Sequence, residues 1–305
     1  MKIVVTGSLG HISKPLTQEL VQKGHTVTVI SSEPERQKDI EAIGATAAIG
    51  TVEDVDFLTG TFKGADAVYT MIPPGNYNDQ NLDIPKQVLQ LASNYKRAIE
   101  QSGVKRVVQL SSIGAHMDKG NGLLVVYNLM ESKLNELPSD VAITFMRPVG
   151  FYYNLFAFIN TIKTQGIIAS NYGGDNKKPW VSPIDIADAV AEEITKPSEG
   201  RSELIAMRKV RYVASEEISS NEIASILGAA IGKPDLKWIV IPDEQLLNGR
   251  IAAGMNPQIA KGLVEMNASA RTAALYEDYY RNRPELGKVK MKDFAKEFTV
   301  VYQQN

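Results

Sequence analysis

The residues whose types and spacing most clearly suggest a binding function form a glycine-containing turn near the start of the chain. The run Thr6-Gly7-Ser8-Leu9-Gly10-His11-Ile12-Ser13 follows a β-branched segment and precedes apolar residues at helical spacing. Gly7 permits a tight turn, and Gly10 lets a pyrophosphate approach backbone N–H groups at the positive end of a helix dipole. The turn therefore predicts dinucleotide binding by Gly7, Ser8, Leu9, Gly10, His11 and Ile12. The alternative is an ordinary strand–helix turn that contains two glycines.

The kind of dinucleotide depends on the residues after the second predicted strand. An acidic residue there accepts hydrogen bonds from the ribose of NAD(H) and repels the extra phosphate of NADP(H). Here the strand is followed by Ser31 and Ser32, and Arg36 is near enough in sequence to reach a phosphate. These residues favour NADP(H) over NAD(H), whereas Glu33 would oppose this if its side chain pointed inward. Alternatively, Ser31, Ser32 and Arg36 form a solvated loop, with Ser32 capping the next helix.

Strand-like and helix-like segments alternate through the first half of the chain. Apolar runs predict strands at residues 2–5, 26–30, 46–49, 65–72, 104–110 and 141–146. Helical patterns predict helices before Gly24 and at residues 33–43, 82–102 and 127–137. Such alternation implies right-handed crossovers and a parallel sheet that is covered on both faces. We therefore predict an α/β fold with a doubly wound, Rossmann-like parallel sheet and a smaller C-terminal α+β lobe.

The smaller lobe is expected because the regular alternation of strand-like and helix-like segments ends after residue 148. We predict an aromatic-rich helix at 151–164, helices at 183–195, 220–231 and 292–302, and short strands around Leu204 and Trp238. Asp185 suits the start of its helix, and the basic run 208–211 is interpreted as a solvated loop. The predicted organisation is an NAD(P)-binding domain at 1–150, to which 180–200 return, and a substrate-binding lobe that takes most of 151–305.

Composition excludes several classes of function. The chain has no cysteine and three histidines, none at metal-ligand spacing, so no metal site is expected. The net charge of -2 gives no electrostatic reason to expect nucleic acid as a partner. No segment approaches the roughly 18–20 apolar residues of a membrane span, and the apolar run Ile3-Val4-Val5 is too short for us to expect a signal peptide. We expect a cytoplasmic monomer or homodimer with a small-molecule substrate and no membrane partner.

Several segments together resemble the NmrA-like family of atypical short-chain dehydrogenase/reductases. They are the glycine turn, residues 64–68 leading to Ile72-Pro73-Pro74, residues 103–108 leading to Ser111-Ser112, Met146-Arg147-Pro148 with Phe151 and Asn154, residues 181–188, and residues 220–234. The resemblance covers most of the chain and is weak after about residue 240. It implies that Met71, Ile72 and Pro73 flank the adenine-side phosphates and ribose, that Ser111 and Ser112 lie near the nicotinamide ribose, and that Pro148 to Phe151 line the nicotinamide pocket. Thr51 replaces an acidic residue that many relatives carry, which puts an adenine contact there in doubt.

Catalytic machinery is harder to assign. Short-chain reductases use a Tyr and a Lys four residues apart, on one face of a helix. Here Glu131 follows Tyr127 at that spacing and Lys133 lies on another face, so the pair is absent. Tyr127 and His116 remain weak candidates for proton donors. Of the five aromatic residues between 151 and 158, one or two are expected to line a pocket and the others to pack in the core.

Three functions are compatible with these observations. The first is an NAD(P)H-dependent oxidoreductase that reduces a small quinone-like or carbonyl substrate, because the cofactor itself carries the hydride chemistry. The second is a regulatory protein that senses NADP(H) without turnover. The third is a sugar-nucleotide epimerase-like enzyme, which the missing Tyr–Lys pair disfavours.

Overall fold

The computed structural model describes residues 1–197 and 208–304, and its centre is a sheet of seven parallel strands. The strand order is β10-β6-β5-β4-β1-β2-β3. The bounds are β1 Lys2–Val5, β2 Thr26–Ser31, β3 Thr46–Ile49, β4 Ala67–Thr70, β5 Arg106–Leu110, β6 Ala142–Pro148 and β10 Arg208–Val213. The order reverses between β1 and β4, where open α/β sheets place their ligands. The predicted α/β, Rossmann-like fold is confirmed.

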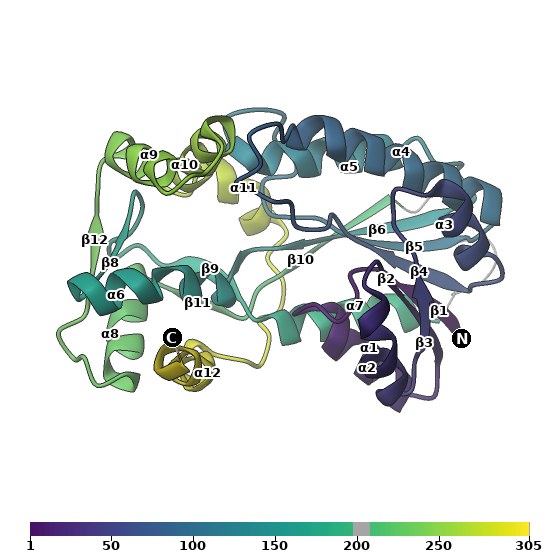
Figure 1. Cartoon of the computed structure of the whole chain (residues 1–305), viewed down its shortest axis with the longest axis horizontal. Helices are drawn as coiled ribbons and strands as arrows, with labels where there is room; N and C mark the ends of the chain where they lie inside the picture. Colours follow the sequence, from purple (N-terminus) through teal and green to yellow (C-terminus); the bar gives the residue numbers. More distant parts are fainter. Residues whose placement is uncertain (198–207, 305) are drawn as a thin grey trace.

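Helices cover both faces of this sheet (Figure 1). One layer contains α1 Ser13–Gln22, the short helices Pro34–Arg36 and α2 Gln37–Ala42, and α7 Pro183–Thr195. The opposite layer contains α3 Val55–Phe62, α4 Ile84–Ser102 and α5 Val125–Leu134, which follows the short helix Gly122–Leu124. Each layer seals its own apolar core against the sheet, which is why most strand residues are buried on both faces.

Local signals fix the ends of the longest of these helices. The Asp83 side chain accepts a hydrogen bond from the Lys86 amide at the start of α4. Gly103 ends the helix with φ 77°, a left-handed conformation that favours glycine. Because α4 ends at Ser102, β5 begins only a few residues later, at Arg106. The strand ends at Leu110, at the carboxyl edge of the sheet.

A second body of structure lies beyond the carboxyl ends of the strands (Figure 1). Its strands form two small sheets, one of β7 Gly150–Phe151, β9 Lys178–Val181 and β11 Glu216–Ile218, and one of β8 Ile167–Ser170 and β12 Lys237–Val240. Its helices include the 3₁₀ helix Tyr152–Phe158, α6 Ile159–Gln165, α8 Ser220–Ala230 and α12 Met291–Gln304. A third apolar core, rich in aromatic residues, holds these elements together.

Two helices that the sequence patterns did not predict form a hairpin on the other side of this body. They are α9 Asp243–Ala252 and α10 Pro257–Ser269, and α11 Ala274–Arg281 follows them. The hairpin of residues 243–269, called the roof hairpin below, docks closely against the short helix before α5. A Cβ on Gly122 would lie 2.1 Å from the Gly262 carbonyl oxygen, so the two backbones leave no room for a side chain.

Two interpretations from the sequence need correction. The basic run 208–211 is not a solvated loop but the start of β10, whose Lys209 and Arg211 pair with Glu193 and Glu192 at the sheet edge. The predicted aromatic helix at 151–164 is a short strand, a 3₁₀ helix and α6 in succession. The expected strand around Leu204 lies outside the described residues.

Candidate active site

The glycine turn forms a cradle of backbone amides at the carboxyl end of β1. Gly7 has φ 89° and Ser8 has φ 52°, and the Gly10 amide donates to the Gly7 carbonyl oxygen at 3.1 Å. Within the part of the chain that the structure describes, the amides of Leu9, His11 and Ile12 have no hydrogen-bond partner. Unpaired amides at a helix N-terminus suit an anion.

Glycine occupies positions 7 and 10 of the turn for different structural reasons. A Cβ on Gly7 would lie 2.4 Å from the Met71 Sδ and 2.7 Å from the Ser13 Oγ, so the fold itself requires glycine there. A Cβ on Gly10 would meet only the Gly7 carbonyl oxygen, at 3.1 Å. The chain therefore leaves space above Gly10, as a group bound outside the turn would need. Ser13 stands in the third position of the motif, and its hydroxyl donates to the Thr6 carbonyl oxygen at 2.8 Å.

The other predicted segments meet the turn at the same edge of the sheet. The Ser8 amide donates to the Ile30 carbonyl oxygen at 3.1 Å, which ties the turn to β2. Met71 packs under Gly7, with Ile72 half-buried and Pro73 exposed beyond it. The Ser111 amide donates to the Met146 carbonyl oxygen at 2.7 Å, and half-buried Ser112 follows it. Pro148 is buried at the end of β6, and Phe151 lies next to it on β7.

The residues expected to distinguish NADP(H) from NAD(H) lie beside the turn. Ser31 is buried, and its hydroxyl accepts hydrogen bonds from the Ser8 hydroxyl at 3.0 Å and the Glu33 amide at 3.2 Å. Ser32 is exposed. The Arg36 Nε is 3.0 Å from the Glu33 Oε2, and both side chains are about half exposed. The carboxylate of Glu33 is therefore held by Arg36 at the protein surface.

The aromatic residues after β6 divide into two groups. Tyr152, Phe156 and Phe158 belong to the third core or pack against it. Tyr153 instead stacks on His11 of the glycine turn, with ring centroids 4.7 Å apart, and Phe151 lies 5.2 Å from Tyr153. Two of the five aromatic residues, Phe151 and Tyr153, thus border the turn.

Three further phenols, those of Tyr69, Tyr77 and Tyr127, lie within electrostatic reach of Tyr153. The hydroxyl groups of Tyr69, Tyr127 and Tyr153 lie within electrostatic reach of one another, and Tyr77 approaches Tyr127 and Tyr153. Burial, followed by the influence of Tyr77 and Tyr153, raises the pKa of the Tyr127 phenol. Tyr69 is fully buried at the end of β4, and its hydroxyl makes no hydrogen bond to the described residues. A buried, unpaired hydroxyl at this edge is what a site for a polar ligand would show.

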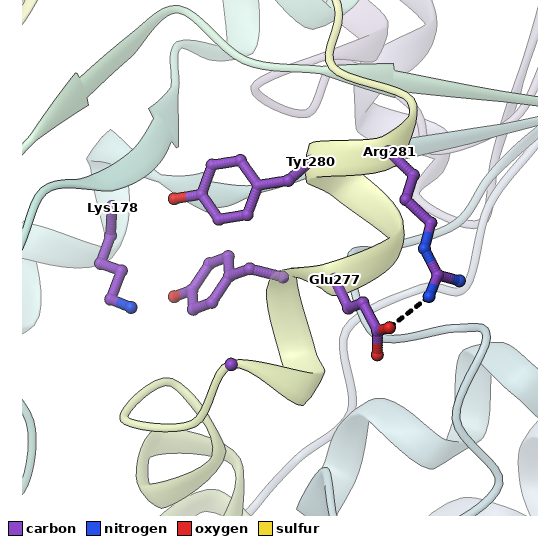
Figure 2. Close-up of a pocket in the computed structure, with 6 residues that line it drawn as sticks. Lys178, Glu277, Tyr280 and Arg281 are labelled. Atoms are coloured by element: carbon purple, nitrogen blue, oxygen red, sulfur yellow. Dashed lines mark hydrogen bonds and ion pairs between the residues drawn. The ribbon is translucent and has the colours of Figure 1, made fainter.

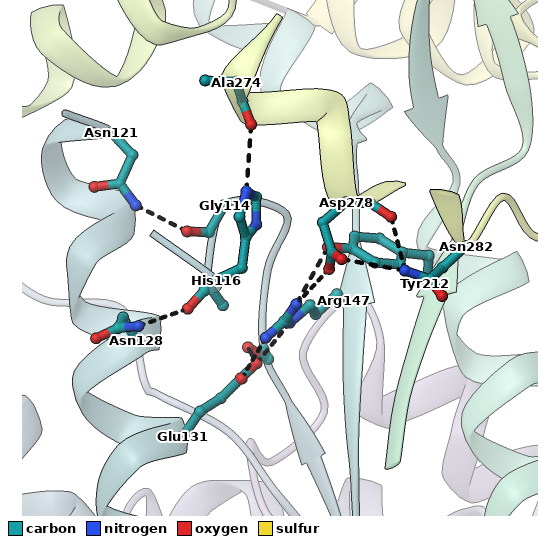
Figure 3. Close-up of polar contacts among 12 residues, drawn as sticks. Gly114, His116, Asn121, Asn128, Glu131, Arg147, Tyr212, Ala274, Asp278 and Asn282 are labelled. Atoms are coloured by element: carbon teal, nitrogen blue, oxygen red, sulfur yellow. Dashed lines mark hydrogen bonds and ion pairs between the residues drawn. The ribbon is translucent and has the colours of Figure 1, made fainter. Parts of the chain in front are cut away.

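Glu131 does not act on Tyr127, although it stands one helical turn away. Its carboxylate makes two hydrogen bonds with Arg147, at 2.9 Å and 2.6 Å, and accepts a third from the Ser111 hydroxyl at 2.5 Å (Figure 3). Arg147 also donates to Asp278 of α11 at 2.9 Å, and the Tyr212 hydroxyl donates to the same Asp278 oxygen at 2.6 Å. This buried network joins α5, β6, β10 and α11 at the edge of the site.

His116 lies away from the group of phenols. Its side chain is exposed, and its Nε2 is 3.2 Å from the carbonyl oxygen of Ala274, at the start of α11 (Figure 3). Lys133 pairs with Glu136 on the surface of α5 at 2.8 Å. His116 thus contacts the start of α11, whereas Tyr127 lies within electrostatic reach of Tyr153, which stacks on His11.

Several residues near this site could not be predicted from the sequence. Tyr69 looked like an ordinary strand residue, and Tyr77 follows two prolines in a segment without periodicity. The Arg147–Asp278 contact joins residues 131 positions apart, so no local pattern reveals it. The only available signal was the family resemblance, which included Arg147.

Metal-binding clusters and membrane-spanning helices are absent from the part of the chain that the structure describes. Among residues 1–197 and 208–304, no group of three or more His, Asp or Glu side chains is arranged to hold a metal ion. No helix in the same ranges has the length and apolarity to cross a membrane.

The fold and the glycine turn together define an α/β protein of the dinucleotide-binding class. The chain belongs to the NAD(P)H-binding family, whose model matches residues 7–197. This membership agrees with the resemblance to NmrA-like atypical short-chain dehydrogenase/reductases.

Individual relatives share this fold at low sequence identity. A curated relative from Streptomyces griseus, a (4-alkanoyl-5-oxo-2,5-dihydrofuran-3-yl)methyl phosphate reductase, is 24% identical over 76% of this chain and 74% of its own. The structure of an NADPH-dependent quinone oxidoreductase of Escherichia coli with NADPH superposes with a TM-score of 0.78, at 18% identity, over 97% of this chain and 99% of that one. A nucleoside-diphosphate-sugar epimerase of Staphylococcus aureus gives a TM-score of 0.73 at 16% identity, over 97% and 100% of the two chains. The fold alone therefore does not distinguish reductases from epimerases. The distinction must come from the residues of the site.

Proposed function

We propose that this protein is an NADPH-dependent reductase of a small quinone-like or conjugated carbonyl substrate. The observation that carries the proposal is the set of unpaired amides of Leu9, His11 and Ile12 around the open space at Gly10, beside Tyr127 and Tyr153. The amides and the N-terminus of α1 would hold the pyrophosphate. The absence of a Tyr–Lys pair argues against an epimerase.

The adenine end of the cofactor would lie along β2. Ser32 is exposed where a ribose phosphate would come, and Arg36 needs only to leave Glu33 to reach it. No acidic residue occupies positions 31 and 32, where a carboxylate would repel that phosphate. Met71, Ile72 and Pro73 would border the adenine-side ribose and phosphates. These features support NADP(H) over NAD(H).

The nicotinamide end would lie between Ser111, Ser112, Pro148 and Phe151. When bound, NADPH supplies the hydride. Phe151 and Tyr153 would hold a flat substrate against it. A phenol is protonated at neutral pH, and burial raises the pKa of Tyr127 further above its ordinary value. Tyr127 can therefore donate a hydrogen bond to the substrate oxygen on which negative charge develops. The second lobe would supply the remaining substrate contacts.

The direct test mixes the purified protein with NADPH and a panel of quinones and follows the loss of absorbance of the reduced cofactor. We expect oxidation of NADPH, and a lower kcat for Tyr127→Phe with an unchanged Kd for NADPH. Tyr302→Phe is the matched control, because Tyr302 lies on α12 and packs against the third apolar core rather than at the glycine turn. Tight NADPH binding without oxidation by any quinone would favour the sensor, and no binding would refute both functions.

A further inference from the structure

The loop between β4 and α4 buries very little of its own surface. Residues 73–81 are all exposed, and the first buried side chain after them is that of Leu82. The loop nevertheless contains turns of its own, because the Asp79 amide donates to the Asn76 carbonyl oxygen at 3.0 Å and the Leu82 amide donates to the Asp79 carbonyl oxygen at 3.2 Å. A preformed segment with so little buried apolar surface can open locally at a low cost in free energy.

The start of this loop is fixed beside the glycine turn. Met71, which directly follows β4, lies so close to Gly7 that a Cβ on Gly7 would be 2.4 Å from the Met71 Sδ. The hydroxyl of Tyr95, a fully buried residue of α4, donates to the Met71 carbonyl oxygen at 2.9 Å. Figure 1 shows the chain running from the end of β4 to the hairpin of α9 and α10. The loop therefore links the candidate cofactor site to the second lobe.

The exposed middle of the loop is held by the turn between α9 and α10 of the roof hairpin. The Asn256 amide donates to the Tyr77 carbonyl oxygen at 3.0 Å. The Nδ2 of the same residue donates to the carbonyl oxygens of Asp79 at 3.1 Å and Gln80 at 3.2 Å. In the other direction, the Gln80 Nε2 donates to the Gly254 carbonyl oxygen at 3.2 Å. These hydrogen bonds, called the clasp below, fasten the loop to the second lobe.

Asn256 is the central residue of the clasp. Its side chain is buried, and its Oδ1 accepts hydrogen bonds from the amides of Gln258 at 2.9 Å and Ile259 at 3.4 Å, which caps α10. The side-chain amide thus uses its acceptor for the helix and its two donors for the loop. A buried polar group with all its partners in place favours one arrangement of the segments that it joins. Asn256 therefore sets the position of the loop relative to the roof hairpin.

We propose that Asn256 is a positioning residue that holds residues 73–81 closed beside a bound dinucleotide and thereby sets how fast the cofactor leaves. This inference rests on the proposed function, in which the start of the loop borders the adenine-side ribose and phosphates. Asn256 acts through the loop rather than on the cofactor itself. When the clasp opens, the middle of the loop is free to move away while Met71 and Leu82 keep its ends in place. Segments that close over a cofactor or substrate in this way can limit turnover through release.

The test compares the unaltered protein with Asn256→Ser. A serine hydroxyl can still cap α10, but it lacks the two amide donors that hold the loop carbonyl oxygens. We expect NADPH to dissociate roughly three- to tenfold faster in stopped-flow displacement, as the loss of these hydrogen bonds would produce. In hydrogen–deuterium exchange, the amides of Asp79 and Leu82 should lose protection in the same variant. Gln80→Ala, which removes the other side-chain contact of the clasp, should also speed release.

Two variants serve as controls. Asn248→Ser makes the same substitution at an exposed position of the same hairpin. Glu277→Gln breaks the ion pair with Arg281 on α11 of the same lobe, at a depression of about 500 Å³ that Lys178 of β9 also lines (Figure 2). Neither variant changes a residue of the clasp, so neither should alter the release of NADPH or the exchange of the loop amides.

Three results would overturn this role of Asn256. They are an unchanged release rate in Asn256→Ser, a faster release that Asn248→Ser shares, and a loss of protection that spreads along α10 instead of staying in the loop. A titration with NADPH, made first, judges the proposed function separately. If the unaltered protein does not bind NADPH, the proposed function and this inference both fail, whereas normal binding with an unchanged release rate refutes this inference alone.

Discussion

Glu131 and Arg147 form a buried, two-pronged ion pair at the position where short-chain reductases carry their catalytic lysine. The distances are 2.9 Å from Arg147 Nε to Glu131 Oε1 and 2.6 Å from Nη2 to Oε2, with side chains only 8% and 7% exposed. The helix position that would hold a lysine near the ribose is therefore occupied by Glu131, whose carboxylate is bound to Arg147 in the protein interior. This agrees with the proposal that reduction relies on Tyr127 and the cofactor rather than on a Tyr–Lys pair.

The first prediction concerns the stability that this pair provides. Glu131→Gln leaves Arg147 without its closest compensating charge in a buried place, which typically costs about 3–5 kcal/mol. Urea unfolding should show a lower midpoint with an unchanged slope. Glu136→Gln, which breaks the surface pair with Lys133, is the control and should change the free energy of unfolding by less than about 1 kcal/mol. Equal stability of the two variants would contradict this account.

Much of the fold could be predicted because it depends on local periodicity. Strands β1 to β6 are short apolar runs between turn residues, and α4 has a clear apolar stripe between Asp83 and Gly103. The glycine turn could be predicted because its position between a strand and a helix is visible in the sequence. In both cases the information lies within a few neighbouring residues.

The remainder depends on contacts that are distant in sequence. β10 was missed because its charged side chains suit a sheet edge, where Lys209 and Arg211 find acidic partners on α7. α9 was missed because it buries no residue completely and so lacks an apolar stripe. The meeting of Tyr69, Tyr77, Tyr127 and Tyr153 requires four separate segments to be folded first.

The second prediction separates the two glycines of the turn. Gly10→Glu should still fold, because the new Cβ meets one backbone oxygen at 3.1 Å, a tight contact that a small shift of the Gly7 carbonyl would relieve. Its carboxylate would occupy the position of the pyrophosphate and repel the phosphates. We expect the Kd for NADPH to rise by well over roughly tenfold in a titration followed by calorimetry. Gly60→Glu is the control, because a Cβ there meets nothing within 4 Å. Unchanged affinity in a folded Gly10→Glu variant would place the pyrophosphate elsewhere.

The third prediction concerns the choice of cofactor. Arg36 is shared between Glu33 at 3.0 Å and Asp39 at 3.8 Å, so freeing it should strengthen its attraction for a ribose phosphate. Glu33→Gln should lower the Kd for NADPH, and Arg36→Ala should raise it roughly three- to tenfold, as expected for an exposed charge-assisted hydrogen bond. Neither change should alter the Kd for NADH. Lys38→Ala removes a like charge from an exposed position two residues further on, at the start of α2, and should leave both constants unchanged. Equal effects on the two cofactors would refute the role of Arg36.

The last prediction concerns a carboxyl group whose ionisation opposes folding. Burial, and then the nearby carboxylate of Glu19, raises the pKa of Asp188 on α7, while Lys288 acts in the opposite direction. A raised folded-state pKa means that the stability from this group is fully present below the unfolded pKa of about 4 and is lost as the pH rises through the folded value. Asp188→Asn stays neutral and should therefore be more stable than the unaltered protein at pH 7. With the partial exposure of Asp188, the gain should be no more than about 1 kcal/mol.

The pH dependence distinguishes this effect from a simple change in packing. The advantage of Asp188→Asn in urea unfolding should shrink toward zero at about pH 3, where the native carboxyl group is protonated in both states. Asp293→Asn provides a control of opposite sign, because the Lys290 amide donates to its carboxylate at 3.1 Å and lowers its pKa. That variant should be less stable than the unaltered protein at pH 7, and its deficit should also fade as the carboxylate is protonated. A gain for Asp188→Asn that is the same at both pH values would show that packing, not charge, is responsible.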